Sequence, residues 1–252
     1  MRHLFCFTML LAAGALNAQL PRPDSVKTAD GPLLVQPVNH GCLVLQWKGK
    51  TIYVDPYGGR QIFAGMPAAD LILITDIHQD HLDTATLLGV VGKDPLIVAP
   101  QAVADVIAGK IRSEIRVLPN GQSTVFGNID IVAIPMYNLP EEAGSRHPRG
   151  RGNGYVLHIG ERYVYISGDT EDIPEMRGLR NIDVAFVCMN EPYTMSVEQA
   201  ASAVISFSPR IVYPYHYRGQ DGLSDVEKFK KLVTEGVSTT EVRLRDWYSI
   251  KK

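Results

Sequence analysis

Residues 75–83 read TDIHQDHLD and place three carboxylates and two imidazoles in one short segment. The segment follows the apolar run 71–75, which predicts a buried strand. No Lys or Arg occurs between Gln61 and Gly92, so no side chain nearby in sequence offsets the negative charge. Clustered carboxylates raise their pKa or bind a cation, and interleaved imidazoles favour a divalent metal ion. The alternative is a solvated loop in which His81 caps a helix.

The sequence around this loop alternates predicted strands and helices. Strands are expected at 42–47, 51–54, 71–75, 96–99, 123–126, 129–135, 155–159, 163–167, 184–187 and 211–213, and helices at 83–91, 101–107 and 197–207. Each half of the chain opens with hairpins and continues with strands and helices in turn, and no linker separates the halves. We therefore expect two sheets packed around one shared core, with helices outside.

The N-terminal residues resemble a secretory signal. Arg2 and His3 precede the apolar run 4–16, and cleavage is expected after Ala18. The alternative is an uncleaved anchor or a buried helix, although the run is shorter than the roughly 20 residues that span a bilayer. The predicted organisation is a signal peptide at 1–18, a flexible lead-in at 19–32 and one domain at 33–252. The mature chain is expected to be periplasmic or secreted, without stable membrane insertion.

Composition limits the classes of function. The 252 residues are 45% hydrophobic and 21% charged, which suits one folded domain. With 25 Lys and Arg against 27 Asp and Glu, the net charge of -2 gives no general attraction to nucleic acid. Cys42 and Cys188 remain after signal removal and are expected to be buried thiols, with a bridge between them left open. No Gly-x-Ser-x-Gly elbow is present, which disfavours a serine hydrolase.

Residues 76–81 resemble the metallo-β-lactamase superfamily motif His-x-His-x-Asp-His, with Asp76 in place of the first histidine. His147, Asp169 and His216 follow in the order of the family's third histidine, bridging aspartate and last histidine. The similarity extends over nearly all the mature chain. It is strongest to the branch that contains lactonases of the ascorbate-6-phosphate type and phospholipase-D-like phosphodiesterases. The resemblance implies an α/β fold, the four-layer αββα sandwich.

By position, the resemblance also implies two metal sites that share one carboxylate. The first would use Asp76, His78 and His147, the second would use Asp80, His81 and His216, and Asp169 would bridge them. Zn²⁺ or Mn²⁺ is expected, and the carboxylate of Asp76 makes harder ions such as Mn²⁺ or Fe²⁺ more competitive. Two such ions lower the pKa of a bound water toward ~7. Asp80 or Asp169 would then orient that water or carry its proton.

Seven other side chains are weaker candidates. Arg149, Asn190, Tyr215, Tyr217 and Arg218 are expected near the substrate, and His40 and Asp55 are expected behind the metal-binding residues. Each has an ordinary structural alternative. Arg149 suits a solvated loop, His40 suits a hydrogen-bonded structural histidine, and the tyrosines suit a packed aromatic cluster.

The sequence thus predicts an exported, metal-dependent hydrolase that cleaves a small ester, lactone or phosphodiester. The alternative is a non-catalytic metal-binding sensor or scavenger that uses the same pocket. A bridging set argues for catalysis, because a closed structural site needs no open position for water. No appended domain or basic stripe points to nucleic acid. The sequence does not indicate the physiological substrate or the oligomeric state.

Overall fold

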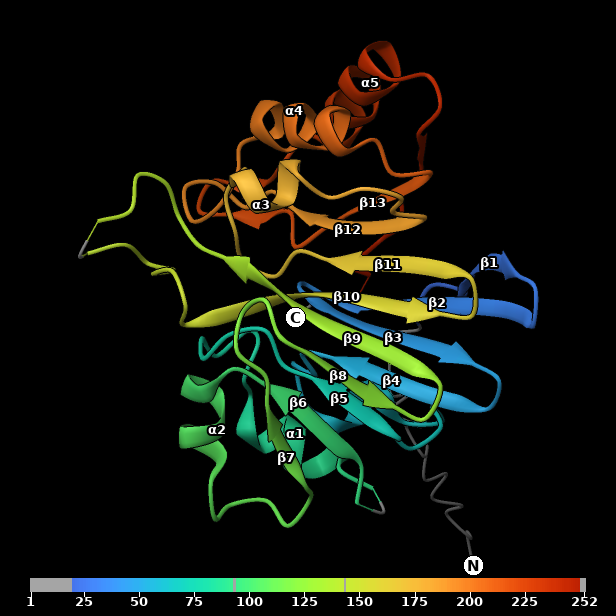
Figure 1. Ribbon diagram of the computed structural model, residues 1–252, viewed down its shortest axis with the longest axis vertical. Helices are drawn as coiled ribbons and strands as arrows, with labels where there is room; N and C mark the ends of the chain where they lie inside the picture. Colours follow the sequence, from blue (N-terminus) through green and yellow to red (C-terminus); the bar gives the residue numbers. More distant parts are fainter. Residues whose placement is uncertain (1–19, 93, 143, 250–252) are drawn as a thin grey trace, which may run out of the picture.

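Two seven-stranded sheets pack face to face in the computed structural model, which describes residues 20–92, 94–142 and 144–249 (Figure 1). The predicted signal peptide lies outside these residues. No helix within the described ranges is long and apolar enough to cross a membrane.

The first sheet holds its strands in sequence order. They are β1 (Asp24–Thr28), β2 (Gly31–Asn39), β3 (Cys42–Trp47), β4 (Lys50–Val54), β5 (Leu71–Leu73), β6 (Leu96–Ala99) and β7 (Ile115–Val117). The strands β1 to β4 are antiparallel neighbours, and β4 to β7 are parallel ones. The carboxyl ends of the parallel strands therefore meet at one edge of the sheet.

The second sheet repeats this plan in the order β16-β13-β12-β11-β10-β9-β8. Its strands are β8 (Ser123–Phe126), β9 (Ile129–Met136), β10 (Gly152–Ile159), β11 (Arg162–Ile166), β12 (Val184–Cys188), β13 (Ile211–Tyr215) and β16 (Glu241–Val242). The antiparallel part is β8 to β11, and β11, β12, β13 and β16 are parallel. A separate two-stranded ribbon joins β14 (Arg218–Gly219) and β15 (Gly222–Leu223).

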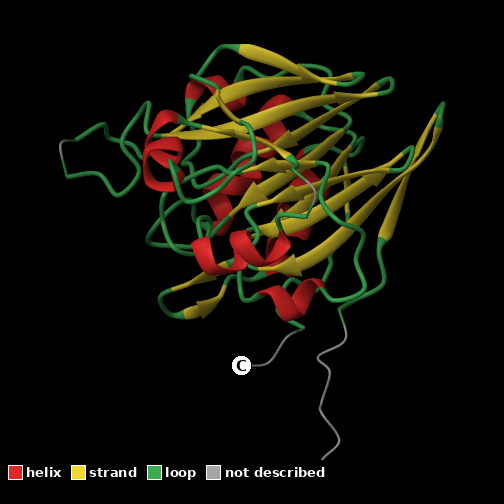
Figure 2. Cartoon of the chain, turned by 90° about the horizontal axis from the view of Figure 1, so that it is seen from below, coloured by secondary structure: helices red, strands yellow, loops and turns green. Residues whose placement is uncertain are grey.

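Helices cover the outer face of each sheet (Figures 1 and 2). The first sheet carries η1 (Arg60–Phe63), α1 (Thr84–Val90) and α2 (Gln101–Ile107), and the second carries α3 (Pro174–Arg177), α4 (Val197–Phe207) and α5 (Val226–Gly236). The predicted four-layer αββα architecture is confirmed.

The strand β5 shows why some strands of this fold are apolar at every position. Leu71 and Leu73 belong to the core between the sheets, whereas Ile72 and Ile74 pack against the side that α1 and α2 cover. Successive side chains of a strand point to opposite faces, so a strand buried on both faces must be apolar throughout. Burying each such side chain stabilises the fold by roughly 1.5–3 kcal/mol.

The structure differs from the flexible lead-in predicted at 19–32. β1 begins at Asp24 and pairs with β2, and its inward side chains are Val26 and Thr28. The run DSVKT is polar by composition, and it forms an edge strand because all five of its residues pair with β2. The side chain of Asp24 accepts a hydrogen bond from the Tyr213 hydroxyl at 2.8 Å, which fastens this edge to the second sheet.

The two described cysteines are free and buried, as predicted for thiols. Cys42 faces the helix side of the first sheet, and Cys188 lies in the core that includes the second. Because they occupy different cores, no bridge joins them.

Candidate metal centre

The candidate site lies where the parallel strands of both sheets end. Asp55 follows β4, the loop 75–83 follows β5, Asp169 follows β11 and His216 follows β13. His147 comes from the loop between β9 and β10, which projects from the body of the molecule in yellow-green (Figure 1). Loops at the carboxyl ends of strands are the common place for ligand sites in α/β folds.

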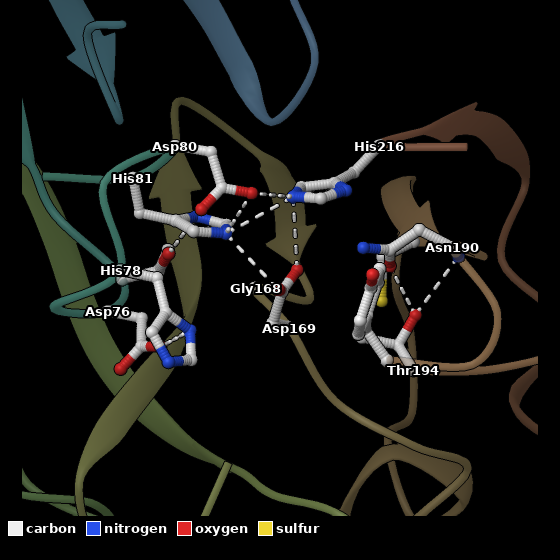
Figure 3. A network of polar contacts seen from close by, with 12 residues as sticks. Asp76, His78, Asp80, His81, Gly168, Asp169, Asn190, Thr194 and His216 are labelled. Carbon is white, nitrogen blue, oxygen red and sulfur yellow. Dashed lines mark hydrogen bonds and ion pairs between the residues drawn. The ribbon is translucent and has the colours of Figure 1, made fainter. Parts of the chain in front are cut away.

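All seven predicted metal-binding side chains lie together in two groups. One group is Asp80, His81, Asp169 and His216, the other is Asp76, His78 and His147, and within each the candidate ligand atoms lie within 4.8 Å of one another. Figure 3 shows His81 and His216 facing each other, with Asp80 and Asp169 on either side of their ring nitrogens.

Asp169 lies between the two groups. Its Oδ2 is 3.2 Å from Nε2 of His81 and 3.2 Å from Nε2 of His147. Its Oδ1 is 3.3 Å from Nε2 of His216. Asp80 completes the second group, since its Oδ2 is also 3.3 Å from Nε2 of His216. One buried carboxylate thus faces ligands of both groups.

The donor atoms fit divalent cations. His147 Nε2, Asp169 Oδ1 and His78 Nδ1 are buried without a well-formed hydrogen bond, and their close neighbours are other atoms of these two groups. Nε2 of His81 and Nε2 of His216 are only 3.2 Å apart. Buried polar atoms are rarely left unpaired, and each exception needs an explanation. Mixed imidazole nitrogens and carboxylate oxygens directed into one space are suited to ions such as Zn²⁺, Mn²⁺ or Fe²⁺.

Two of the imidazoles are held in orientation by polar contacts at Nδ1. Nδ1 of His81 lies 2.8 Å from Asp55 Oδ2, and Asp55 also accepts hydrogen bonds from the backbone and hydroxyl of Thr75. Nδ1 of His147 lies 3.1 Å from Oδ1 of Asn138, which also accepts from the His147 backbone. A proton held on Nδ1 leaves Nε2 free to bind a cation.

His40 supports the second group. Its Nε2 is 3.2 Å from Asp80 Oδ2, its Nδ1 is 2.7 Å from the Tyr248 hydroxyl, and its ring centroid is 3.8 Å from that of His216. Burial, followed by the neighbouring His216, lowers the pKa of His40 to about 4. His40 is therefore neutral at pH 7 and can donate one proton to Asp80.

Asp76 and Asp80 stay ionised despite their burial. Burial favours protonation, but His78 and Arg151 lower the pKa of Asp76 to about 2. His216 and His40 likewise hold the pKa of Asp80 well below its usual value. The site therefore presents negative charge at neutral pH.

His81 responds to that negative charge. Burial alone would lower its pKa, but Asp169 and Asp55 raise the pKa well above the usual 6.5. A divalent ion would have to displace the resulting proton, so cation binding here is coupled to proton release.

The backbone is unusual where it carries these residues. His40, Asp55 and His216 have φ angles of 56°, 45° and 48°. The left-handed region is uncommon for residues other than glycine and is maintained where the surrounding structure enforces it. His216 N donates to the His40 carbonyl at 3.2 Å, which links two of the three positions.

Solvent reaches the site from one side. The side chains of Asp80 and His78 are 30% and 24% exposed, whereas those of His81, His147 and His216 are fully buried. A small molecule would therefore approach over Asp80 and His78.

The structure corrects part of the predicted substrate-facing set. Tyr215 is fully buried, and its hydroxyl accepts a hydrogen bond from Gly168 N at 3.0 Å. Tyr217 is 7% exposed and donates to the Arg245 carbonyl. Both rings lie in the core that includes the second sheet. Neither is placed to contact a substrate.

The other three candidates differ in position. Asn190 is 3% exposed and accepts a hydrogen bond from the Thr194 hydroxyl. Arg149 points away to Glu141 and Glu175, so its charge is already paired. Arg218 is exposed and stacks on Tyr248, with 4.3 Å between the guanidinium and the ring centroid.

Sequence reasoning missed Asn138, Tyr248 and the two hydrogen bonds that Thr75 donates to Asp55. Asn138 and Tyr248 lie far from the motif, and ordinary loop sequence surrounds both. No spacing rule marks such residues, because their role depends on tertiary contacts alone.

Comparisons with known proteins agree with this geometry. A family model described as a β-lactamase superfamily domain matches residues 35–216. A metal-dependent hydrolase of Pyrococcus furiosus is 32% identical over an alignment of 197 residues, with coverage of 74% of this chain and 86% of that protein.

Solved structures share the fold. A Parabacteroides distasonis protein described as a metal-dependent hydrolase is 39% identical, with a TM-score of 0.79 over 89% of this chain and 98% of that one. The diiron β-hydroxylase CmlA of Streptomyces venezuelae is 22% identical, with a TM-score of 0.65 over 89% of this chain and 53% of that one. At that identity the second similarity concerns the fold alone. The chain belongs to the metallo-β-lactamase superfamily, among its metal-dependent hydrolases.

Proposed function

We propose that the chain hydrolyses a small ester, lactone or phosphodiester at the two groups of metal-binding residues. The observation that carries this proposal is the position of Asp169, whose carboxylate faces His81, His147 and His216 together. Two divalent ions held by these residues would supply a water of lowered pKa and polarise the bond under attack.

Asp80 is the carboxylate best placed to handle the proton of the attacking water. Its side chain is 30% exposed, against 0% for Asp76 and 4% for Asp169. The hydrogen bond from His40 fixes one Asp80 oxygen, so the carboxylate keeps one orientation. Asp169, buried between the groups, acts by holding them at a fixed separation. These are the roles that the two predicted catalytic aspartates take in this proposal.

Arg218 is the remaining candidate for contact with substrate. Its guanidinium lies on Tyr248, and the Tyr248 hydroxyl bonds to His40, which in turn bonds to Asp80. This chain of contacts leads from an exposed positive charge to the solvent-facing ligand. A substrate with a phosphate or carboxylate group would gain from that charge.

The metal itself is proposed as Zn²⁺ or Mn²⁺, with Fe²⁺ as the third candidate. Three carboxylates and four imidazoles make a mixed donor set that suits all three ions. Elemental analysis of protein purified without added metal distinguishes them.

The test combines metal content with a panel of a lactone, an ester, a thioester, a phosphodiester and a β-lactam. The wild-type protein is expected to contain metal and to turn over one of the first four classes. His81→Ala and Asp169→Asn are each expected to remove most activity while the far-ultraviolet circular dichroism stays unchanged. Near-normal turnover by either variant contradicts the site, and bound metal without any turnover favours the sensor or scavenger.

Export is part of the proposal and is supported by residues 1–18, with their basic start and apolar run. The mature protein is expected in the periplasm or the medium, with Gln19 as its first residue. Cell fractionation followed by N-terminal sequencing tests this. Recovery of the uncleaved chain in the cytosol contradicts it.

A further inference from the structure

Asp76 is bound on both oxygens by one arginine. Arg151 Nε donates to Oδ1 at 3.0 Å, and Nη2 donates to Oδ2 at 2.8 Å. Asp76 is fully buried, so this paired geometry is shielded from water and strong. The residue that stands in place of the motif's first histidine therefore already has a cation.

The same arginine reaches His78. Arg151 Nη2 lies 3.4 Å from Nε2 of His78, and Nδ1 of that ring lies 2.9 Å from Asp76 Oδ2. The guanidinium thus competes for two of the three ligands in this group.

The other group has no such competitor. No Lys or Arg among the described residues forms an ion pair with Asp80 or Asp169, whose close partners are histidines. Behind His81 lies a further carboxylate, Asp55, which increases the basicity of the ring. The two groups therefore differ in charge although both have suitable ligands.

We propose that Arg151 makes the two metal sites unequal, an inference that rests on the proposed function. The group Asp80, His81, Asp169 and His216 fills first. The group Asp76, His78 and His147 fills only when Arg151 leaves Asp76. The side chain of Arg151 is 19% exposed, so it has a path to solvent. A positive charge in contact with a ligand opposes a second cation at that ligand.

The test is binding of Zn²⁺ alone, measured by equilibrium dialysis with elemental analysis, and of Co²⁺ alone, followed by its visible spectrum. Wild-type protein is expected to bind a first equivalent at least about tenfold more tightly than a second. In Arg151→Met, the second equivalent is expected to bind at least about tenfold more tightly than in wild type, with the first nearly unchanged.

Two further variants control this comparison. Arg149→Met removes a nearby arginine that pairs with Glu141 and Glu175, and it is expected to bind both equivalents as wild type does. Arg151→Lys keeps the charge but cannot bind both Asp76 oxygens as a fork, so its second affinity should lie between those of wild type and Arg151→Met. This variant also serves if Arg151→Met does not fold.

The outcomes separate this inference from the proposed function. Two results would overturn the role of Arg151 while leaving a metal centre in place. The first is that wild type binds both metal equivalents with equal affinity. The second is that the affinity for the second equivalent is unchanged or weaker in Arg151→Met and unchanged in Arg151→Lys. Failure of wild type to bind even one equivalent would overturn the metal centre itself, and the inference with it.

Discussion

A methyl group on Gly41 would lie 2.9 Å from Cδ2 of His216 and 3.3 Å from Cε1 of His81. Gly41→Ala is therefore expected to push the two imidazoles apart and to distort the second group of ligands. Displacement by about 1 Å can reduce activity on the order of a hundredfold. Metal content and turnover of the purified variant measure the effect.

Gly144→Ala is the matched control. An added Cβ at Gly144 meets no atom within 4 Å, and the residue lies in the loop between β9 and β10. This variant should retain wild-type metal content. Equal metal content and equal turnover in Gly41→Ala and Gly144→Ala would show that the close packing at Gly41 does not position His216 and His81.

Asp55→Asn tests the support behind His81. The asparagine fills the same space but lacks the charge that holds the Nδ1 proton, and Asp55 makes three hydrogen bonds to Thr75 and His81. Metal affinity is expected to fall about ten- to hundredfold. Asp70→Asn is the control, because Asp70 caps Thr51 N at the opposite end of the same strands. A matching loss in both variants would mean that general destabilisation is the cause.

Asp24→Asn should weaken the fold in a pH-dependent way. Burial would raise the pKa of Asp24, but the Tyr213 hydroxyl, the Ser25 backbone and Arg243 lower the pKa below 3.8. A carboxylate with a depressed pKa stabilises the folded state above its unfolded pKa, and this contribution is lost as the pH falls through the folded pKa. Wild type should therefore exceed Asp24→Asn in unfolding free energy at pH 7, and the difference should shrink below about pH 4.

Urea unfolding at pH 7 and pH 3 measures that difference. Asp30→Asn, on the same hairpin, is the control, because Asp30 pairs only with the half-exposed Lys48 among the described residues. It should match wild type at both pH values. A difference for Asp24→Asn that stays constant with pH would contradict the assigned ionic contribution.

Chelation should lower the thermal stability of the protein. An ion that binds only the folded state at a hundred times its Kd contributes about 2.7 kcal/mol, which corresponds to about 5–10 °C in Tm for a chain of this size. Asp169→Asn removes the shared carboxylate and should show a smaller shift on chelation. Scanning calorimetry with and without chelator provides the measurement, and an identical shift in both proteins would argue against Asp169 as a shared ligand.

The sequence predicted the parts of the site that lie at strand ends. The run 71–75 is apolar on both faces, and the polar loop after it has to begin where the core ends. Asp55, Asp169 and His216 likewise follow strands, so their convergence follows from the direction of parallel strands. The superfamily resemblance pointed to Asp169 and His216, and the direction of the parallel strands explains why they lie together with Asp55.

Other features depend on contacts that no local pattern records. β1 is polar in composition and becomes a strand because β2 pairs with it. Asn138 orients His147 across a loop, and Arg151 meets Asp76 from 75 positions away. The helix α5 had usable signals, a cap at Asp225 and apolar residues at helical spacing, and sequence reasoning passed over them.

His81 and His216 are 135 positions apart in the chain, one from each half of the molecule, yet their ring nitrogens nearly touch. An ion bound by both rings would link the two sheets reversibly. If the chain were cut between β7 and β8, the two fragments would then bind each other more tightly in the presence of the ion. A chelator would weaken that binding and release one fragment from the other.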